Sequence, residues 1–229
     1  YIARFAHAIC LGFPPSDDQL RFPVKPIVTG NPVRTHVTDG SKKRGLDLTV
    51  LSGKNPILLV VGGSQGAEAL NEAVVQHIDA LLDVCDIVHV TGPEKTGAPK
   101  RAGYWKTEFA HEELRDLYAI ASIALTRCGA GMISELAING IPMLLCPIRG
   151  LANDHQFENA VRVEREGAGH IISQEDLPRR LVPTLTSLLE QKATLLMMKK
   201  NTAHLSQPEA ARRIAKIILE SVARKKKKH

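Results

Sequence analysis

The stretch LLVVGGSQGAEALNEAVVQHI, Leu58–Ile78, decides the fold class of this chain. Its first residues belong to a continuous apolar run, Pro56–Val61, which is typical of a strand buried on both faces of a parallel sheet. Beyond the glycines, apolar residues recur at helical spacing, at positions 70, 74, 78 and 81. The stretch therefore predicts a buried strand, a glycine turn and one helix.

The turn itself, GGSQGA at Gly62–Ala67, lies where a helix begins. A helix N-terminus has free N–H groups and a partial positive charge, so it attracts phosphate, and Ser64 adds a hydroxyl donor. The turn lacks the spacing of a GxGxxG motif and the Lys of a P-loop, so neither an NAD nor an ATP site is indicated. Taken alone, it is more often a merely tight turn than a binding site.

The rest of the chain continues the alternation of strands and helices. Strands are predicted at 86–92, 105–110, 122–126, 141–147 and 168–173, and helices at 111–121, 131–140, 154–167, 175–191, 193–204 and 208–223. Residues 23–34 form a short extended piece that ends in a turn, and GSKKRGLDL at 40–48 is predicted as a polar loop. This pattern predicts an α/β fold with a doubly wound parallel sheet of Rossmann type.

Composition narrows the class of protein. The chain has 229 residues, 44% of them hydrophobic, and no run long enough to cross a bilayer. A net charge of +6 favours anionic partners, although much of this charge lies in the tail at 224–229. Only 4% of the residues are aromatic, which argues against a surface on which nucleic-acid bases stack. Its four cysteines lack CxxC spacing and are expected to be free thiols in a reducing cytoplasm. The abrupt amphipathic start predicts a fragment of a longer protein.

A second strand–turn–helix motif is TRCGAGMISELAINGIP, Thr126–Pro142. Glu135 is expected about one and a half turns into its helix, facing back toward the turn. A carboxylate suits the two hydroxyls of a ribose, whereas it repels phosphate. The alternative is a Glu that complements the helix dipole.

A third motif is LANDHQFENA, Leu151–Ala160, in which Asp154 is predicted to cap a helix. Gln156 and Asn159 are three residues apart, so their amides share one helix face, and paired amides suit sugar hydroxyls. His155 is a possible base, although a lone exposed His is more often not one. Three such turns after strands of one sheet predict a crevice for a nucleotide-diphospho-sugar.

The ordered set GNPVR, GGSQGA, RCGAGMISELAINGIP and DHQFENA resembles the MurG family, the N-acetylglucosaminyltransferases that build lipid II of bacterial cell walls. The resemblance implies a glycosyltransferase of the GT-B type, family 28, of which this chain is the C-terminal, donor-binding half. It implies that residues 1–27 are the end of the acceptor domain and the crossover, 28–205 the donor domain, 206–223 a C-terminal helix and 224–229 a basic tail.

The resemblance also implies site residues. Arg34 and Ser64 are expected at the nucleotide-diphosphate, the main chain of Ala110 at the uracil, and Glu135 at the ribose hydroxyls. The turn Ala130, Gly131, Met132, Ile133 and Ser134 is expected to offer N–H groups to the diphosphate, and Gln156, supported by Asn159, to contact the N-acetylglucosamine. Cys128 and Met132 depart from the family pattern, and Met132 removes a hydroxyl expected to reach a phosphate.

The implied reaction is an inverting transfer of N-acetylglucosamine from UDP-GlcNAc to lipid I, undecaprenyl-diphospho-MurNAc-pentapeptide, at the cytoplasmic side of the inner membrane. The catalytic base is expected in the acceptor domain. No metal is expected, since no Asp-x-Asp pair lies near a strand end, and neither a cofactor nor a nucleic-acid partner is expected. The anionic membrane face is an expected partner. Two alternatives remain: a GT-B donor domain with a separate acceptor subunit, and a non-catalytic module that binds anionic surfaces.

Overall fold

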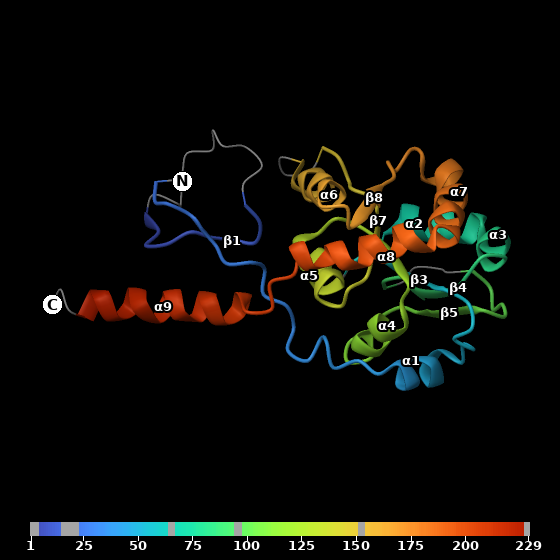
Figure 1. Ribbon diagram of the computed structural model, residues 1–229, viewed down its shortest axis with the longest axis horizontal. Coiled ribbons are helices and arrows are strands. Elements are labelled where there is room, and N and C mark those ends of the chain that lie inside the picture. Colours follow the sequence, from blue (N-terminus) through green and yellow to red (C-terminus); the bar gives the residue numbers. More distant parts are fainter. Residues whose placement is uncertain (1–4, 15–22, 64–66, 94–97, 151–153, 227–229) are drawn as a thin grey trace.

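A computed structural model describes residues 5–14, 23–63, 67–93, 98–150 and 154–226. Figure 1 shows one sheet flanked by helices, with a long C-terminal helix, α9, that extends away from it together with the N-terminal segment. The predicted α/β class is therefore confirmed.

The main sheet has six parallel strands in the order β5–β4–β3–β6–β7–β8. Their bounds are β3 Ile57–Val61, β4 Asp86–Val90, β5 Tyr104–Thr107, β6 Ile123–Thr126, β7 Met143–Leu145 and β8 Gly169–Ile171. The first strand of the sheet, β3, lies in the middle and pairs with β4 on one side and with β6 on the other. The order thus reverses between β3 and β6, which is the point at which doubly wound sheets bind ligands.

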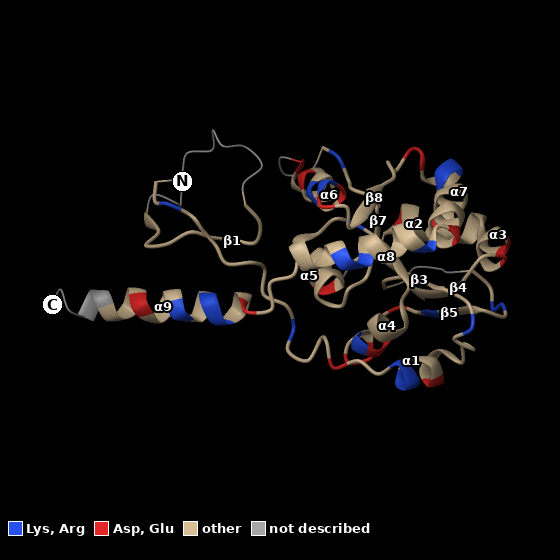
Figure 2. Cartoon of the chain, viewed as in Figure 1, with Lys and Arg blue, Asp and Glu red and all other residues tan. Residues whose placement is uncertain are grey.

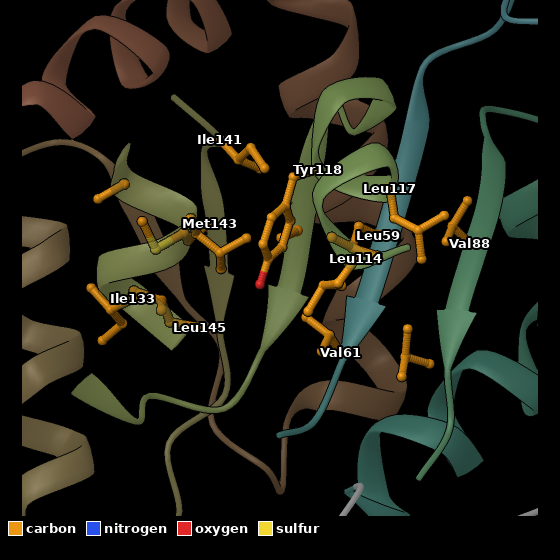
Figure 3. Packing of buried hydrophobic residues seen from close by; sticks show 14 of the residues in the cluster. Leu59, Val61, Val88, Leu114, Leu117, Tyr118, Ile133, Ile141, Met143 and Leu145 are labelled. Carbon is orange, nitrogen blue, oxygen red and sulfur yellow. The ribbon is translucent and has the colours of Figure 1, made fainter. Parts of the chain in front are cut away.

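Helices cover both faces of the sheet. One core cluster contains α4 Leu114–Ile120, α5 Ala130–Ile138 and α6 His155–Arg165; the other contains α2 Glu68–Gln76, α3 Ile78–Leu82 and α7 Leu177–Glu190. Alternate strand residues divide between them, so that Leu59 and Val61 face the first cluster and Leu58 and Val60 the second. Figure 3 shows the first cluster, with Leu59, Val61 and Val88 packed against Leu114 and Leu117 of α4.

Two sequence predictions were wrong. The helix expected after the glycine turn is two helices, α2 and α3, which meet at His77 (φ −114°, ψ 19°). The apolar spacing still identifies the buried face, because Leu70, Val74, Ile78 and Leu81 all lie in one cluster. Hydrophobic spacing does not detect a single residue that leaves helical dihedrals.

The polar segment expected as a loop contains a helix, α1 Lys42–Thr49. The Ser41 side chain accepts the Arg44 N–H at 3.4 Å, as an N-cap does. Arg44 also forms an ion pair with Asp116 of α4 at 2.7 Å, and a Cβ on Gly45 would lie 2.4 Å from the Asp116 carbonyl oxygen. The helix depends on this close contact with α4, which local sequence does not reveal.

The chain ends form a separate region. Strands β1 Cys10–Leu11 and β2 Ile27–Val28 pair in parallel as a small sheet. After α7 the chain continues as α8 Lys192–Asn201, the short helix η3 Thr202–His204 and α9 Ala210–Lys226. An apolar pocket between segment 7–10 and α9 has a volume of about 330 Å³. Figure 2 shows that α9 contains both basic and acidic residues.

Candidate functional site

The carboxyl ends of β3 and β6 are tied together where the strand order reverses. The Thr126 hydroxyl donates to the carbonyl oxygen of Val61 at 2.8 Å. Beyond these strands, a Cβ added at Gly63 or Gly129 would meet no atom within 4 Å, and Gly63 has φ +95°. The backbone at Gly63 and at Gly129 therefore faces open space, which is what close approach of a ligand requires.

Helix α5 begins at this edge with Gly129 as its N-cap. Its first intrahelical hydrogen bond runs from the Ile133 N–H to the Gly129 carbonyl at 3.0 Å. The N–H groups of Ala130, Gly131 and Met132 precede that bond, so they are the donors that a helix start leaves for a ligand. The first turn of α5 contains no acidic residue.

The remaining residues of the predicted 130–134 turn have other contacts. Ile133 is fully buried in the core, and the Ser134 hydroxyl donates to the Ala130 carbonyl at 2.8 Å. The side chain of Asn31 lies beside the turn, since a Cβ on Gly131 would be 3.8 Å from its Nδ2. Nothing in the sequence pattern of GNPVR indicated this position for Asn31.

Arg34 and Glu135 are 101 positions apart in the chain but form a bidentate ion pair. Arg34 Nε donates to Glu135 Oε1 at 2.7 Å, and Nη2 donates to Oε2 at 2.6 Å. This fork geometry is the strongest form of the interaction, and the bond to Glu135 raises the pKa of the Arg34 guanidinium above its usual value. The expected diphosphate residue and the expected ribose residue thus lie together.

Tyr118 completes what we call the Glu135 cluster: Arg34, Tyr118 and Glu135. Its hydroxyl donates to Glu135 Oε2 at 2.8 Å and lies 3.5 Å from Met132 Sδ. Burial and the adjacent carboxylate raise the pKa of Tyr118 well above its usual value, so the hydroxyl stays protonated. The sequence analysis missed Tyr118. The available indication was a tyrosine, with its polar hydroxyl, on the buried face of a predicted helix.

Gln156 and Asn159 lie at the start of α6, where both amides contact main chain. Gln156 Oε1 accepts the Ile148 N–H at 3.2 Å, and Asn159 Nδ2 donates to the Cys128 carbonyl at 2.9 Å. Asn159 therefore links α6 to the turn before α5. The predicted cap was wrong in its chemistry: Asp154 is at the N-cap position with φ +54°, but its carboxylate accepts the Gly150 N–H instead of capping α6.

Ala110 follows β5 and packs partly buried against the first core cluster. Its neighbour His111 and Arg34 both line a pocket of about 180 Å³. The loop after β5 therefore adjoins the Glu135 cluster. The prediction for Ser64 lies outside the described residues.

The described parts of the chain contain no group of three His, Cys, Asp or Glu side chains arranged to hold a metal ion. Nor does any helix within them combine the length and the apolar character that crossing a bilayer requires. All four cysteines are free, as predicted.

Comparison with known proteins places this chain in a family. The model of the glycosyltransferase family 28 C-terminal domain matches residues 57–214. Among curated relatives is the UDP-N-acetylglucosamine–N-acetylmuramyl-(pentapeptide) pyrophosphoryl-undecaprenol N-acetylglucosamine transferase of Hahella chejuensis, which is 35% identical over 97% of this chain and 62% of its own length. The transferase of the same name from Lachnospira eligens is 37% identical over 76% of this chain and 50% of its own length.

Solved structures agree with these sequence comparisons. The crystal structure of Acinetobacter baumannii MurG superposes with a TM-score of 0.72 and 25% identity, covering 96% of this chain and 62% of that one. The calicheamicin glycosyltransferase CalG4, at 19% identity and a TM-score of 0.56 over 74% of this chain and 45% of its own, shares the fold. The chain thus spans about half to three fifths of the length of the curated relatives described here. The match over residues 57–214 shows that this chain belongs to the glycosyltransferase family 28 C-terminal domain family, and the resemblance to MurG is confirmed.

Proposed function

We propose that this chain is the donor-binding half of a transferase that moves N-acetylglucosamine from UDP-GlcNAc to undecaprenyl-diphospho-MurNAc-pentapeptide, forming lipid II of peptidoglycan. The names of the curated relatives support this substrate pair. Residues 57–214 match a family model that is described as a C-terminal domain, which supports the assignment to the donor-binding half.

One observation carries the proposal: a guanidinium, a carboxylate and a helix N-terminus meet at the edge where the strand order reverses. Arg34 lies 2.6 Å from Glu135, and Glu135 belongs to the helix whose first turn contains Gly131. A cation and free N–H groups suit a diphosphate, while a carboxylate suits neighbouring ribose hydroxyls. A nucleoside diphosphate contains both a diphosphate and, next to it, a ribose with hydroxyls.

In the proposed complex, Glu135 accepts the ribose hydroxyls and the main chain of Ala110 contacts the uracil. The N–H groups of Ala130, Gly131 and Met132, with Arg34 and Ser64, bind the diphosphate. Gln156, supported by Asn159, contacts the sugar. These roles leave Ile133 and Ser134 to hold the turn in shape.

The chemistry that this half supplies is stabilisation of the leaving group. The acceptor C4 oxygen forms a bond to sugar C1, the bond from C1 to the UDP oxygen breaks, and negative charge grows on the diphosphate. Preorganised N–H groups at α5 and the Arg34 guanidinium stabilise that charge without reorganising. The acceptor proton leaves to a base that we place in the other half of the enzyme.

The proposed domain organisation follows from the same assignment. Residues 28–205 form the donor domain, residues 1–27 are the end of the acceptor domain and the crossover, and residues 206–223 are a C-terminal helix. We place the whole enzyme on the cytoplasmic face of the membrane, where a basic tail at 224–229 would favour an anionic surface. Salt-dependent binding of the chain to anionic vesicles tests that placement.

Isothermal titration of the 229-residue chain with UDP-GlcNAc, UDP-galactose and GDP-mannose tests donor binding. We expect UDP-GlcNAc to bind most tightly. Glu135→Ala should raise its Kd about 100-fold, because two hydrogen bonds to a charged group are lost. Glu72→Ala, which removes an exposed carboxylate of α2, is the matched control and should leave the Kd unchanged.

Two results contradict the proposal. Equal affinity of the chain for the three sugar nucleotides removes the donor assignment. Appreciable transfer by this chain alone, assayed with UDP-GlcNAc and the lipid acceptor, shows that the base is not in the other half.

A further inference from the structure

Tyr118 places a hydroxyl inside an otherwise apolar core. It belongs to α4 and is 2% exposed, surrounded by leucine, isoleucine and methionine side chains of the first core cluster. Figure 3 shows its hydroxyl pointing toward the end of the sheet at which the strand arrowheads lie, which is the ligand-binding edge. A buried hydroxyl is costly unless it is hydrogen-bonded, so its partner at that edge explains why it is there.

That partner is the Glu135 carboxylate, which also receives Arg34. Oε2 accepts from Tyr118 at 2.8 Å and from Arg34 Nη2 at 2.6 Å, whereas Oε1 accepts from Arg34 Nε at 2.7 Å. Each carboxylate oxygen has two lone pairs, so Oε1 retains capacity for a further donor. The Glu135 side chain keeps 11% of its surface exposed, so a ligand hydroxyl has access to it.

The two donors differ in how firmly they are held. The Arg34 side chain is 47% exposed and approaches the carboxylate from the open side of the site. Tyr118 is fixed by the packing of α4 against the sheet and approaches from the core. When a diphosphate attracts the guanidinium, Tyr118 is the donor that still holds the carboxylate in place.

We propose that Tyr118 is a positioning residue for nucleotide recognition: its hydroxyl holds the Glu135 carboxylate in the orientation that accepts the ribose hydroxyls, while Arg34 is the exchangeable partner. This inference rests on the proposed binding of a uridine diphosphate. A phenylalanine would fill the same space in the core, so the hydroxyl itself is what the site requires.

The test measures the affinity of Tyr118→Phe for UDP and for 2′,3′-dideoxy-UDP by isothermal titration. We expect the Kd for UDP to rise about tenfold, as for loss of one hydrogen bond to a charged group, and the Kd for the dideoxy analogue to change less than twofold. In a Glu135→Ala background, which has no side-chain acceptor for the Tyr118 hydroxyl, Tyr118→Phe should raise the Kd of either ligand less than twofold. A residue that merely packs would weaken both ligands equally.

Tyr104→Phe is the matched control, because Tyr104 is also buried and hydrogen-bonded but contacts His89 instead of Glu135. It should change neither Kd. Circular dichroism and urea unfolding establish that both variants are folded.

Four outcomes overturn the inference. Tyr118→Phe with unchanged UDP affinity shows that the hydroxyl does not position Glu135, and equal weakening of both ligands shows a general packing role. A wild-type chain that binds UDP and its dideoxy analogue equally removes ribose recognition while leaving diphosphate binding intact. A wild-type chain that binds no UDP at all removes the proposed function, and the inference with it.

Discussion

Tyr104 and Tyr118 are both buried, but their hydroxyls meet different environments. The Tyr104 hydroxyl accepts the Ala98 N–H at 3.1 Å and lies 3.0 Å from His89 Nδ1. The Tyr118 hydroxyl donates to a carboxylate that also pairs with a half-exposed arginine. One tyrosine belongs to a closed neutral network, the other to a charged cluster with an open side.

The closed group, which we call the His89 network, consists of Asn71, His89 and Tyr104. His89 Nε2 lies 2.9 Å from Asn71 Oδ1, and Asn71 Nδ2 donates to the Thr91 carbonyl at 2.9 Å. A neutral His89 with its proton on Nε2 accepts from Tyr104 and donates to Asn71, so every group has a partner. Its three side chains are at most 7% exposed.

The contrast separates hydrogen bonds that stabilise the fold from those that serve a ligand. The His89 network satisfies its members internally and joins α2, β4 and β5. The Glu135 cluster leaves a guanidinium 47% exposed beside a helix start. We therefore expect mutations in the network to change stability and mutations in the cluster to change affinity.

The largest expected effect on stability is that of Asn71→Leu. It removes the partners of His89 Nε2 and of the Thr91 carbonyl, and two buried polar groups left without partners cost about 4 kcal/mol of unfolding free energy. Urea unfolding measures the change. Gln76→Leu, on the exposed side of the same helix, should shift the urea midpoint little. Asn71→Leu should bind UDP with unchanged affinity at urea concentrations at which it remains folded. A stable Asn71→Leu protein would contradict the closed-network interpretation.

A smaller effect is expected from acid. Burial, aided by the charge of Lys106, lowers the pKa of His89 to about 4, so the folded protein disfavours the protonated ring. An unfolded chain takes up that proton near pH 6.5. Neutral His89 therefore contributes about 3 kcal/mol to the free energy of unfolding above about pH 6.5, and this contribution is lost as the pH falls toward 4. The slope of unfolding free energy against pH should flatten in His89→Gln over this window. The same slope in both proteins would refute the assignment to His89.

The smallest effect on stability is expected from Arg34→Met. The arginine is half exposed, and Tyr118 still donates to the Glu135 carboxylate after its removal, so the unfolding free energy should fall by only about 1–2 kcal/mol. UDP affinity should nevertheless fall about tenfold, because a diphosphate loses its cation. Arg44→Met, which removes an equally exposed arginine paired with Asp116, is the matched control for affinity. If both variants bind UDP alike, Arg34 is not a diphosphate ligand.

The sequence predicted the sheet and the helix starts well. Apolar runs such as ILLVV are typical of strands buried on both faces, and the glycines at 140 and 167 take the positive φ that closes α5 and α6. It failed at α1, whose helix is held by Arg44, Asp116 and the close approach of Gly45 to α4. Such contacts between distant segments leave no periodic signal.

The candidate site, like the fold, was only partly predictable from the sequence. Motif resemblance brought Arg34 and Glu135 into one predicted site, but it assigned them to different parts of a ligand and did not predict their contact. Gln156, supported by Asn159, was expected to contact a sugar; what the structure shows is that their amides hydrogen-bond to the main chain of residues 148 and 128.

By itself, the sequence determined the alternation of strands and helices in the main sheet, the glycine turns that follow β3 and β6, and the family. These features depend on residues close together in the chain, where hydrophobic period and backbone freedom act. Only the tertiary structure decided that the Glu135 carboxylate lies between Arg34 and Tyr118, and that His89 is enclosed without charge. Those arrangements join residues from separate elements, and their energy depends on distance, burial and the absence of water, which exist only after the chain has folded.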